Sequence, residues 1–125
     1  SMKKKHIILS RSRCEVLTLV LKKKWFDLIA SGEKEEEYRT AASVWRQIDA
    51  WVGRSTIGLD YKKGVRPIKY DMVVQFCHGY GHNRPTLLMH ATDVNVRTYA
   101  IHPDWGEPND AHLVISLDQP VEFVP

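Results

Sequence analysis

The spacing of apolar residues changes in the first third of the chain, from a pattern typical of a strand to one typical of a helix. Val16 to Leu21 is apolar and partly β-branched, which favours a buried strand. Trp25, Leu28 and Ile29 follow at helical spacing with polar residues between them, and they predict an amphipathic helix against a core. We expect Gly32 to end this helix, because glycine adopts the left-handed conformation without steric cost.

A second helix and several strands are predicted further along the chain. Val44 to Val52 again has helical spacing, and we expect Gly53 to end that helix. Alternating apolar and polar residues predict strands over Tyr70 to Phe76, Thr86 to Val96 and His112 to Leu117, and Val121 to Val124 is expected to extend the last of these after the interruption at Pro120. Glycine and proline favour loops over Gly53 to Lys69 and Ala100 to Asp110, and the first loop is typical of a binding loop or of a disordered segment. Several strands and two short helices indicate an α+β barrel.

The length of 125 residues is sufficient for one domain with one hydrophobic core. We expect residues 1–15 to form an N-terminal extension or an edge strand, and residues 16–125 to form the domain. The net charge of +3 and the pI of about 8.9 are compatible with a polyanionic partner, although phosphate-binding proteins are usually more basic. Charge alone therefore does not decide the partner.

Cysteine usage and hydropathy predict a cytoplasmic protein without a membrane partner. Cys14 and Cys77 lie far apart with no motif around either, which favours a reduced compartment. No stretch is long and apolar enough to span a bilayer. The apolar residues after Lys3 to Lys5 are also too few for a signal peptide.

The charged run from Gly32 to Arg39 directly follows the first predicted helix. In an extended strand Glu37 and Arg39 point to the same side, whereas Lys34 reaches them only if the chain bends after Gly32. If the three side chains converge, they form a site that binds a polar, partly anionic ligand and can move a proton. A salt-bridged strand on the solvated surface is the other interpretation of such a run.

The residues Gly32-x-Lys34-x-x-Glu37-x-Arg39 resemble the signature of the ASCH domain, a family within the PUA-like superfamily. Phe76 to Arg84, FCHGYGHNR, and His102 to Gly106, HPDWG, resemble later motifs of its short, phage-like branch. The combined similarity runs from about Val16 to the C-terminus and is more specific than the first motif alone. It implies a PUA-like β-barrel with two or more short helices.

Two segments depart from the ASCH pattern. Ala41 to Val44 stands before Trp45 where a Pro-Tyr pair is expected, and Gly53 to Pro67 is an insertion relative to that pattern.

The resemblance implies binding of RNA, a nucleotide or a modified nucleoside, because ASCH and PUA-like domains are associated with RNA. The residues expected to contact the ligand are Lys22, Tyr38, Arg39, Arg46, Tyr80 and Trp105. Tyr80 and Trp105 lie in glycine-flanked loops and are candidates for stacking on a base, whereas Trp25 and Trp51 are expected in the core. The oligomeric state stays open.

A hydrolase is the alternative, with Lys34 and Glu37 as catalytic residues. Some small ASCH proteins are amidohydrolases of acetylcytidine, and they carry the lysine that matches Lys34 but a threonine at the position of Glu37. Such a reaction here needs Glu37 as a general base on water, or Thr40 or Ser43 as the nucleophile. Ribonuclease activity, in which Lys34 and Arg39 stabilise the developing phosphate charge, is a further possibility.

No cofactor and no metal are expected. His78 and His82 lie near Cys77, but this spacing crosses two glycines and no second pair of ligands has a recognisable spacing.

Overall fold

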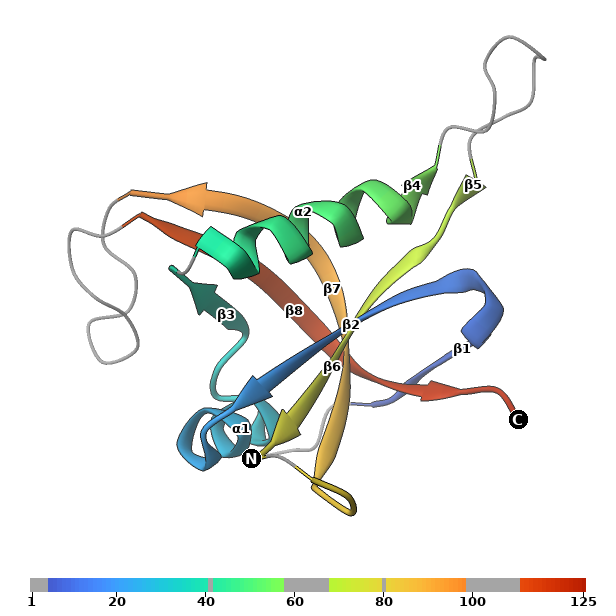
Figure 1. Cartoon of the computed structure of the whole chain (residues 1–125). Coiled ribbons are helices and arrows are strands. Elements are labelled where there is room, and N and C mark those ends of the chain that lie inside the picture. The colour runs from blue at the N-terminus through green and yellow to red at the C-terminus, as the bar shows by residue number, and fades with distance from the viewer. Residues whose placement is uncertain (1–4, 41, 58–67, 80, 99–110) are drawn as a thin grey trace, which may run out of the picture.

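The chain forms an α+β fold in which two helices pack against one strongly curved, mixed sheet (Figure 1). The structure is a computed structural model and describes residues 5–40, 42–57, 68–79, 81–98 and 111–125. The helices are α1 (Lys23–Ser31) and α2 (Ala42–Ser55), and a short 3-10 helix spans Arg11–Arg13. The strands are β1 (Ile7–Leu9), β2 (Cys14–Leu21), β3 (Glu36–Arg39), β4 (Thr56–Ile57), β5 (Ile68–Lys69), β6 (Asp71–His78), β7 (Thr86–Arg97) and β8 (His112–Phe123).

The main sheet has the strand order β1-β8-β7-β6-β2, and β3 also pairs with β8. β1 and β3 pair with different ends of β8: β1 is parallel to Val121–Phe123, and β3 is antiparallel to Leu113–Ser116. β2 is parallel to β6, and β4 and β5 form a separate antiparallel pair. Register shifts near Ala91 interrupt the pairing of β7 with β8, and such bulges increase the local bend and twist of a sheet.

The sheet is curled but not closed, so the barrel expected from the sequence is not formed. No ladder joins β2 to β3 among the described strands. β3 has only four residues, and all of them pair with β8. The side chain of Arg39 crosses the gap between β2 and β3 instead, and it reaches the main chain of β2.

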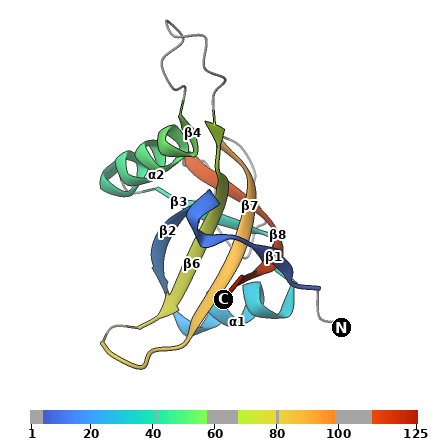
Figure 2. The same cartoon turned by 90° about the vertical axis from the view of Figure 1, so that its right-hand side faces the viewer.

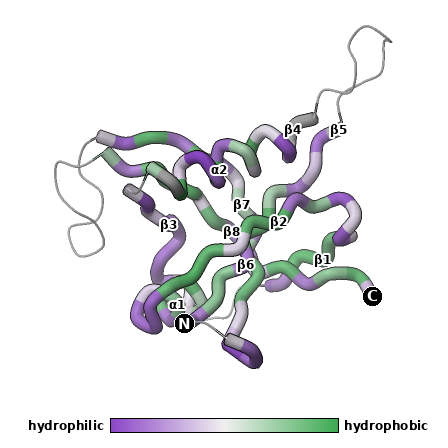
Figure 3. The backbone as a smooth tube through the Cα atoms, in the orientation of Figure 1, coloured by the Kyte–Doolittle hydropathy of each residue, from purple (hydrophilic) through white to green (hydrophobic). Residues whose placement is uncertain are grey.

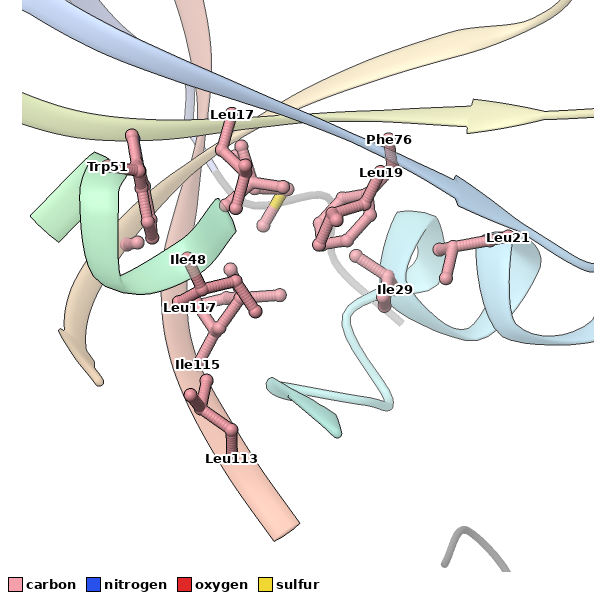
Figure 4. Close-up of a cluster of buried hydrophobic side chains, with 13 residues drawn as sticks. Leu17, Leu19, Leu21, Ile29, Ile48, Trp51, Phe76, Leu113, Ile115 and Leu117 are labelled. Atoms are coloured by element: carbon pink, nitrogen blue, oxygen red, sulfur yellow. The ribbon is translucent and has the colours of Figure 1, made fainter. Parts of the chain in front are cut away.

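The hydrophobic core lies between the sheet and the two helices, which cover opposite ends of the same face (Figures 1 and 2). Leu17, Leu19 and Leu21 alternate along β2 and point into this core, together with Ile29 of α1 and Trp51 of α2 (Figure 4). Figure 3 shows β2 as a largely hydrophobic strand, whereas hydrophilic and hydrophobic residues alternate along α2. Each helix therefore packs against the sheet with one apolar side.

The first predicted helix and its end are confirmed. α1 stops at Ser31, and Gly32 has φ 85°, in the left-handed region where glycine is favoured over other residues. The strand before it starts at Cys14, two residues earlier than predicted, and the sequence expectation of an edge strand near the N-terminus agrees with β1.

Two predictions around the second helix are wrong. α2 does not end at Gly53 but continues to Ser55, because a glycine inside a helix costs only about 1 kcal/mol and Trp51 anchors this turn in the core. The expected loop from Gly53 to Lys69 contains β4 and β5 at its two ends. Residues 58–67 and the expected loop at Ala100 to Asp110 lie outside the described residues.

Candidate functional site

A cavity of about 300 Å³ lies where β2 ends, between the first turn of α1, strand β3 and the start of α2. Figure 1 shows β3 running between the two helices at this place. The polar side chains that line the cavity are Lys22, Lys34, Glu37, Tyr38, Arg39 and Thr40. Apolar contacts come from Val20, Leu21, Trp25 and Val44.

Gly32 positions Lys34 in this cavity. Its left-handed conformation turns the chain back over α1, so that the Gly32 N–H donates to the Ile29 carbonyl (3.1 Å) and the Lys34 N–H to the Leu28 carbonyl (3.0 Å). Paired bonds of this kind fix the chain direction after a helix. β3 begins only at Glu36, so Lys34 precedes the strand. The alternation of side chains between the two faces of a strand therefore does not apply to Lys34. This is the bend that the convergence of the charged side chains requires.

Lys34, Glu37 and Arg39 form an ion triad at the floor of the cavity, in which Lys34 and Glu37 are buried and Arg39 is partly buried. The Lys34 ammonium donates to Glu37 Oε1 at 2.9 Å and also to the main-chain carbonyl of Glu36. Arg39 Nε donates to Glu37 Oε2 at 2.9 Å, and its Nη2 lies 2.8 Å from the same oxygen. Lys34 is 2% exposed and Glu37 4%. Two cations share one carboxylate, so the triad carries a net charge of +1.

Arg39 also connects three elements around the cavity. Its Nη2 donates to the Val20 carbonyl of β2 at 3.0 Å, across the gap that no strand pairing closes. The Trp45 indole of α2 donates to the Arg39 carbonyl at 2.8 Å. Arg39 therefore helps to hold the cavity wall together, in addition to carrying a charge into it.

Aromatic rings flank the Lys34 ammonium. Its Nζ lies 4.8 Å from the centre of the Tyr38 ring and 5.8 Å from that of Trp25, within the range of cation–π attraction. The ammonium of Lys24 lies 4.8 Å from the centre of the Trp25 ring. Trp25, expected in the core from its helical spacing, packs against the core but is only half-buried and also lines the cavity.

A second polar network adjoins the triad through Tyr38. The Tyr38 hydroxyl donates to Glu36 Oε1 at 2.8 Å. The Nη1 and Nη2 groups of Arg97 donate to the two oxygens of the same carboxylate. The hydrogen bond from Arg97 lowers the pKa of Glu36 against the opposing effect of burial. Burial, followed by the bond to Glu36, raises the pKa of Tyr38 well above its usual value. Tyr38 therefore stays a neutral donor.

The cavity presents more donors than free acceptors. Glu37 is its one carboxylate among the described residues, and both oxygens already accept from cations. Lys22 and Thr40 are exposed and line the cavity as well. The arrangement suits a ligand that offers carbonyl, carboxylate or phosphate oxygens.

The other residues expected at the site are distributed differently. Arg46 is exposed on α2 and does not line the cavity, while Tyr80 and Trp105 lie outside the described residues. Sequence reasoning missed Trp25 as a wall of the cavity, and it missed Arg97 as a partner of Glu36. No local signal identifies Arg97, because it lies 61 residues from Glu36 in the sequence.

The described part of the chain has neither a side-chain cluster typical of a metal site nor a helix typical of a membrane span. No group of three or more His, Cys, Asp or Glu side chains there is arranged to hold a metal ion. His78 instead packs with its ring centre 6.3 Å from that of Phe26, and His82 is exposed. Neither of the helices described has the length and apolar character needed to cross a bilayer.

Comparison of the chain with protein-family models, with curated proteins and with solved structures found no match.

Proposed function

We propose that the cavity binds a nucleotide or a modified nucleoside, free or within single-stranded RNA, as the resemblance to PUA-like ASCH domains suggests. The observation that carries this proposal is the ion triad of Lys34, Glu37 and Arg39, two of them buried, at the floor of an open cavity with aromatic walls. The assignment to the ASCH family and to a PUA-like fold is part of the same proposal.

The burial of the triad supports a role in binding more than a role in stability. Removing charges from water costs several kcal/mol per ion, and well-packed apolar residues often replace a buried ion pair with no loss of stability. Three charged side chains at the floor of a cavity are therefore an unfavourable way to stabilise this fold alone. They are well suited to bind the polar edge of a ligand in a site of low dielectric constant.

The shape and chemistry of the cavity fit a single nucleotide unit. Its volume of about 300 Å³ lies at the lower end of the usual range for small-molecule sites. Trp25 and Tyr38 offer apolar rings at its side, and Lys34 and Arg39 offer donors to base carbonyls or phosphate oxygens. If a base stacked on these rings, its polar edge would lie near the triad.

A hydrolase that acts on acetylated cytidine, or a ribonuclease, is the second candidate. Thr40 lines the same cavity as Lys34, so a potential nucleophile and a cation share one cavity. General-base catalysis by Glu37 is less well supported, because both of its oxygens accept hydrogen bonds from cations and have little contact with solvent. Binding is therefore the better supported function.

One set of measurements separates binding from catalysis. Purified protein is titrated by calorimetry with cytidine, acetylcytidine, their monophosphates and a short single-stranded RNA, and product formation from acetylcytidine and from labelled RNA is followed in parallel. We expect binding without turnover. Arg39→Ala should weaken it by about tenfold or more, since a hydrogen bond to a charged group contributes about 1.5–3 kcal/mol. Arg46→Ala, which removes an exposed cation outside the cavity, is the matched control.

The outcomes discriminate between the two candidates. Turnover that disappears in both Lys34→Ala and Glu37→Ala would establish the hydrolase, and its loss in Thr40→Ala alone would identify the nucleophile. Thermal unfolding of each variant shows whether the fold survives, and Thr40→Ala leaves the triad intact. No binding of any of these compounds to the folded wild-type protein would overturn the proposed function.

A further inference from the structure

Two hollows of opposite charge meet at Tyr38. The cavity described above is lined by three cations, Lys22, Lys34 and Arg39, and by one carboxylate, a net charge of +2. The neighbouring hollow, of about 470 Å³, is lined by Glu33, Glu35 and Glu36 and by no cation among the described residues. Tyr38 lines both hollows, so a ligand on one side lies close to the charges of the other.

The cations are concentrated on the α1 side of the cavity. Lys22 precedes the helix, and Lys23 and Lys24 form its first turn, which contains no acidic residue. Lys22 makes no capping bond with its side chain, although this position usually carries a residue that accepts a hydrogen bond from the helix. Lysines at the positive end of a helix repel its dipole, and an anion beside Lys22 would relieve this repulsion.

Arg39 has a donor available for the same anion. Its Nε and Nη2 groups bind Glu37 and Val20, whereas Nη1 makes no hydrogen bond within the described part of the chain. The Arg39 side chain is 21% exposed, so a ligand can reach it from the cavity. Lys22 and Arg39 thus provide two cationic donors to one anionic group, with the buried Lys34 behind them.

The acidic hollow repels the phosphates of a nucleic acid chain, whereas the cations of the cavity attract them. Glu33 is exposed and lines this hollow, together with Ser116 and Leu117 of β8. Arg97 compensates the charge of Glu36, and the exposed Glu33 adds a further carboxylate to this wall. A phosphodiester backbone on that side would be repelled at physiological ionic strength.

We infer that the ligand is a nucleoside monophosphate rather than an internal segment of RNA, with its phosphate at Lys22 and Arg39 and its base toward Trp25 and Tyr38. This inference rests on the proposed function and specifies the ligand of the same cavity. The three cations select the phosphate, and the acidic hollow limits the length of the ligand.

The experiment compares neighbouring lysines. Uridine, uridine monophosphate, inorganic phosphate and a short uridine-containing RNA are titrated into the wild-type protein, Lys22→Gln and Lys23→Gln at one ionic strength. Lys23 is the matched control, because it loses the same charge one position away, pairs with Asp27 and does not line the cavity. We expect the monophosphate to bind about tenfold more tightly than uridine, and Lys22→Gln but not Lys23→Gln to remove this difference.

Glu33→Gln tests the limit on length. We expect it to strengthen binding of the RNA several-fold while leaving the monophosphate nearly unchanged, since only the longer ligand reaches the acidic hollow. RNA that binds the wild-type protein more tightly than the monophosphate, with no effect of this change, would overturn the inference.

Failure of the inference can be told apart from failure of the proposed function. Equal affinities for uridine and its monophosphate would overturn the phosphate site and leave nucleoside binding intact. Binding of inorganic phosphate that Lys22→Gln abolishes, without binding of any nucleoside compound, would support the anion site and overturn the proposed function.

Discussion

The Arg39 guanidinium on β3 donates a hydrogen bond of 3.0 Å to the main-chain carbonyl of Val20 on β2. The two strands are not paired, so a side chain makes a connection that backbone hydrogen bonds make in a closed barrel. Near the other end of β2, the Trp51 indole of α2 donates to the Glu15 carbonyl at 2.8 Å. Side chains from two elements thereby cover parts of an edge that would otherwise be open to other strands.

Arg39→Lys should destabilise the protein even though the charge is kept. A lysine ammonium cannot bind Glu37 and Val20 through two separate nitrogens, as the planar guanidinium does. We expect a loss of about 1.5–3 kcal/mol in the free energy of unfolding, measured in urea. Amide exchange should become faster along β2 and β3. A variant as stable as the wild type, with unchanged exchange, would show that the connection to Val20 contributes little.

Single changes in the triad should destabilise the protein more than its complete replacement by apolar residues. Glu37→Gln leaves the buried Lys34 ammonium without its carboxylate partner, and we expect it to cost about 3–5 kcal/mol. Lys34→Met leaves the pair of Glu37 with Arg39 in place and should cost less. The triple variant Lys34→Met, Glu37→Leu and Arg39→Met should recover most of this loss, because no unpaired charge remains. Denaturant unfolding of the wild type, the triple variant and single variants at each of the three positions, with Glu37→Leu and Arg39→Met included, measures the non-additivity. The folded triple variant should also fail to bind ligand, and strictly additive losses would contradict this explanation.

The contribution of Glu36 to stability should depend on pH. Arg97 lowers the pKa of Glu36 in the folded state, so the stabilisation is present above the unfolded pKa of about 4.3 and is lost as the pH falls through the folded value. Arg97→Gln should therefore be less stable than the wild type at neutral pH, with a difference that shrinks on acidification. Unfolding in urea at several pH values measures this. Arg54→Gln, which removes a cation from the more exposed pair with Glu15, is the control, and a difference independent of pH would refute the assignment.

Tyr38 should remain neutral at a pH where ordinary tyrosines ionise. Its pKa is raised in the folded state, mainly by burial, so its contribution to stability is complete below the unfolded value of about 10 and is lost as the pH rises above it. The chain has five tyrosines, and the absorbance change on alkaline titration reports their ionisation. Tyr38→Phe should leave the titration near pH ~10 unchanged in the folded protein and remove only a later step. A smaller amplitude near the ordinary value would contradict this prediction.

The sequence by itself determined the features that depend on neighbouring residues. The helical period from Trp25 to Ile29 and the glycine at position 32 predicted α1 and its end, because both are local properties of the backbone. The same glycine allowed the bend that brings Lys34 to Glu37, three residues away. Gly53 shows the limit of such reasoning, since the packing of Trp51 in the core outweighs the weak preference of glycine against a helix.

Only the tertiary structure decided what surrounds the ion triad. β2 and β3 lie at opposite ends of the strand order and do not pair, and only the curl of the sheet brings them close enough for Arg39 to reach Val20, 19 residues earlier. The same order brings Arg97 to Glu36, whereas helical spacing alone cannot distinguish a buried Trp25 from one that lines a cavity. Periodicity identifies which side of an element is apolar. Which elements meet, and whether a cavity is left between them, depends on strand register and on packing between residues distant in the sequence.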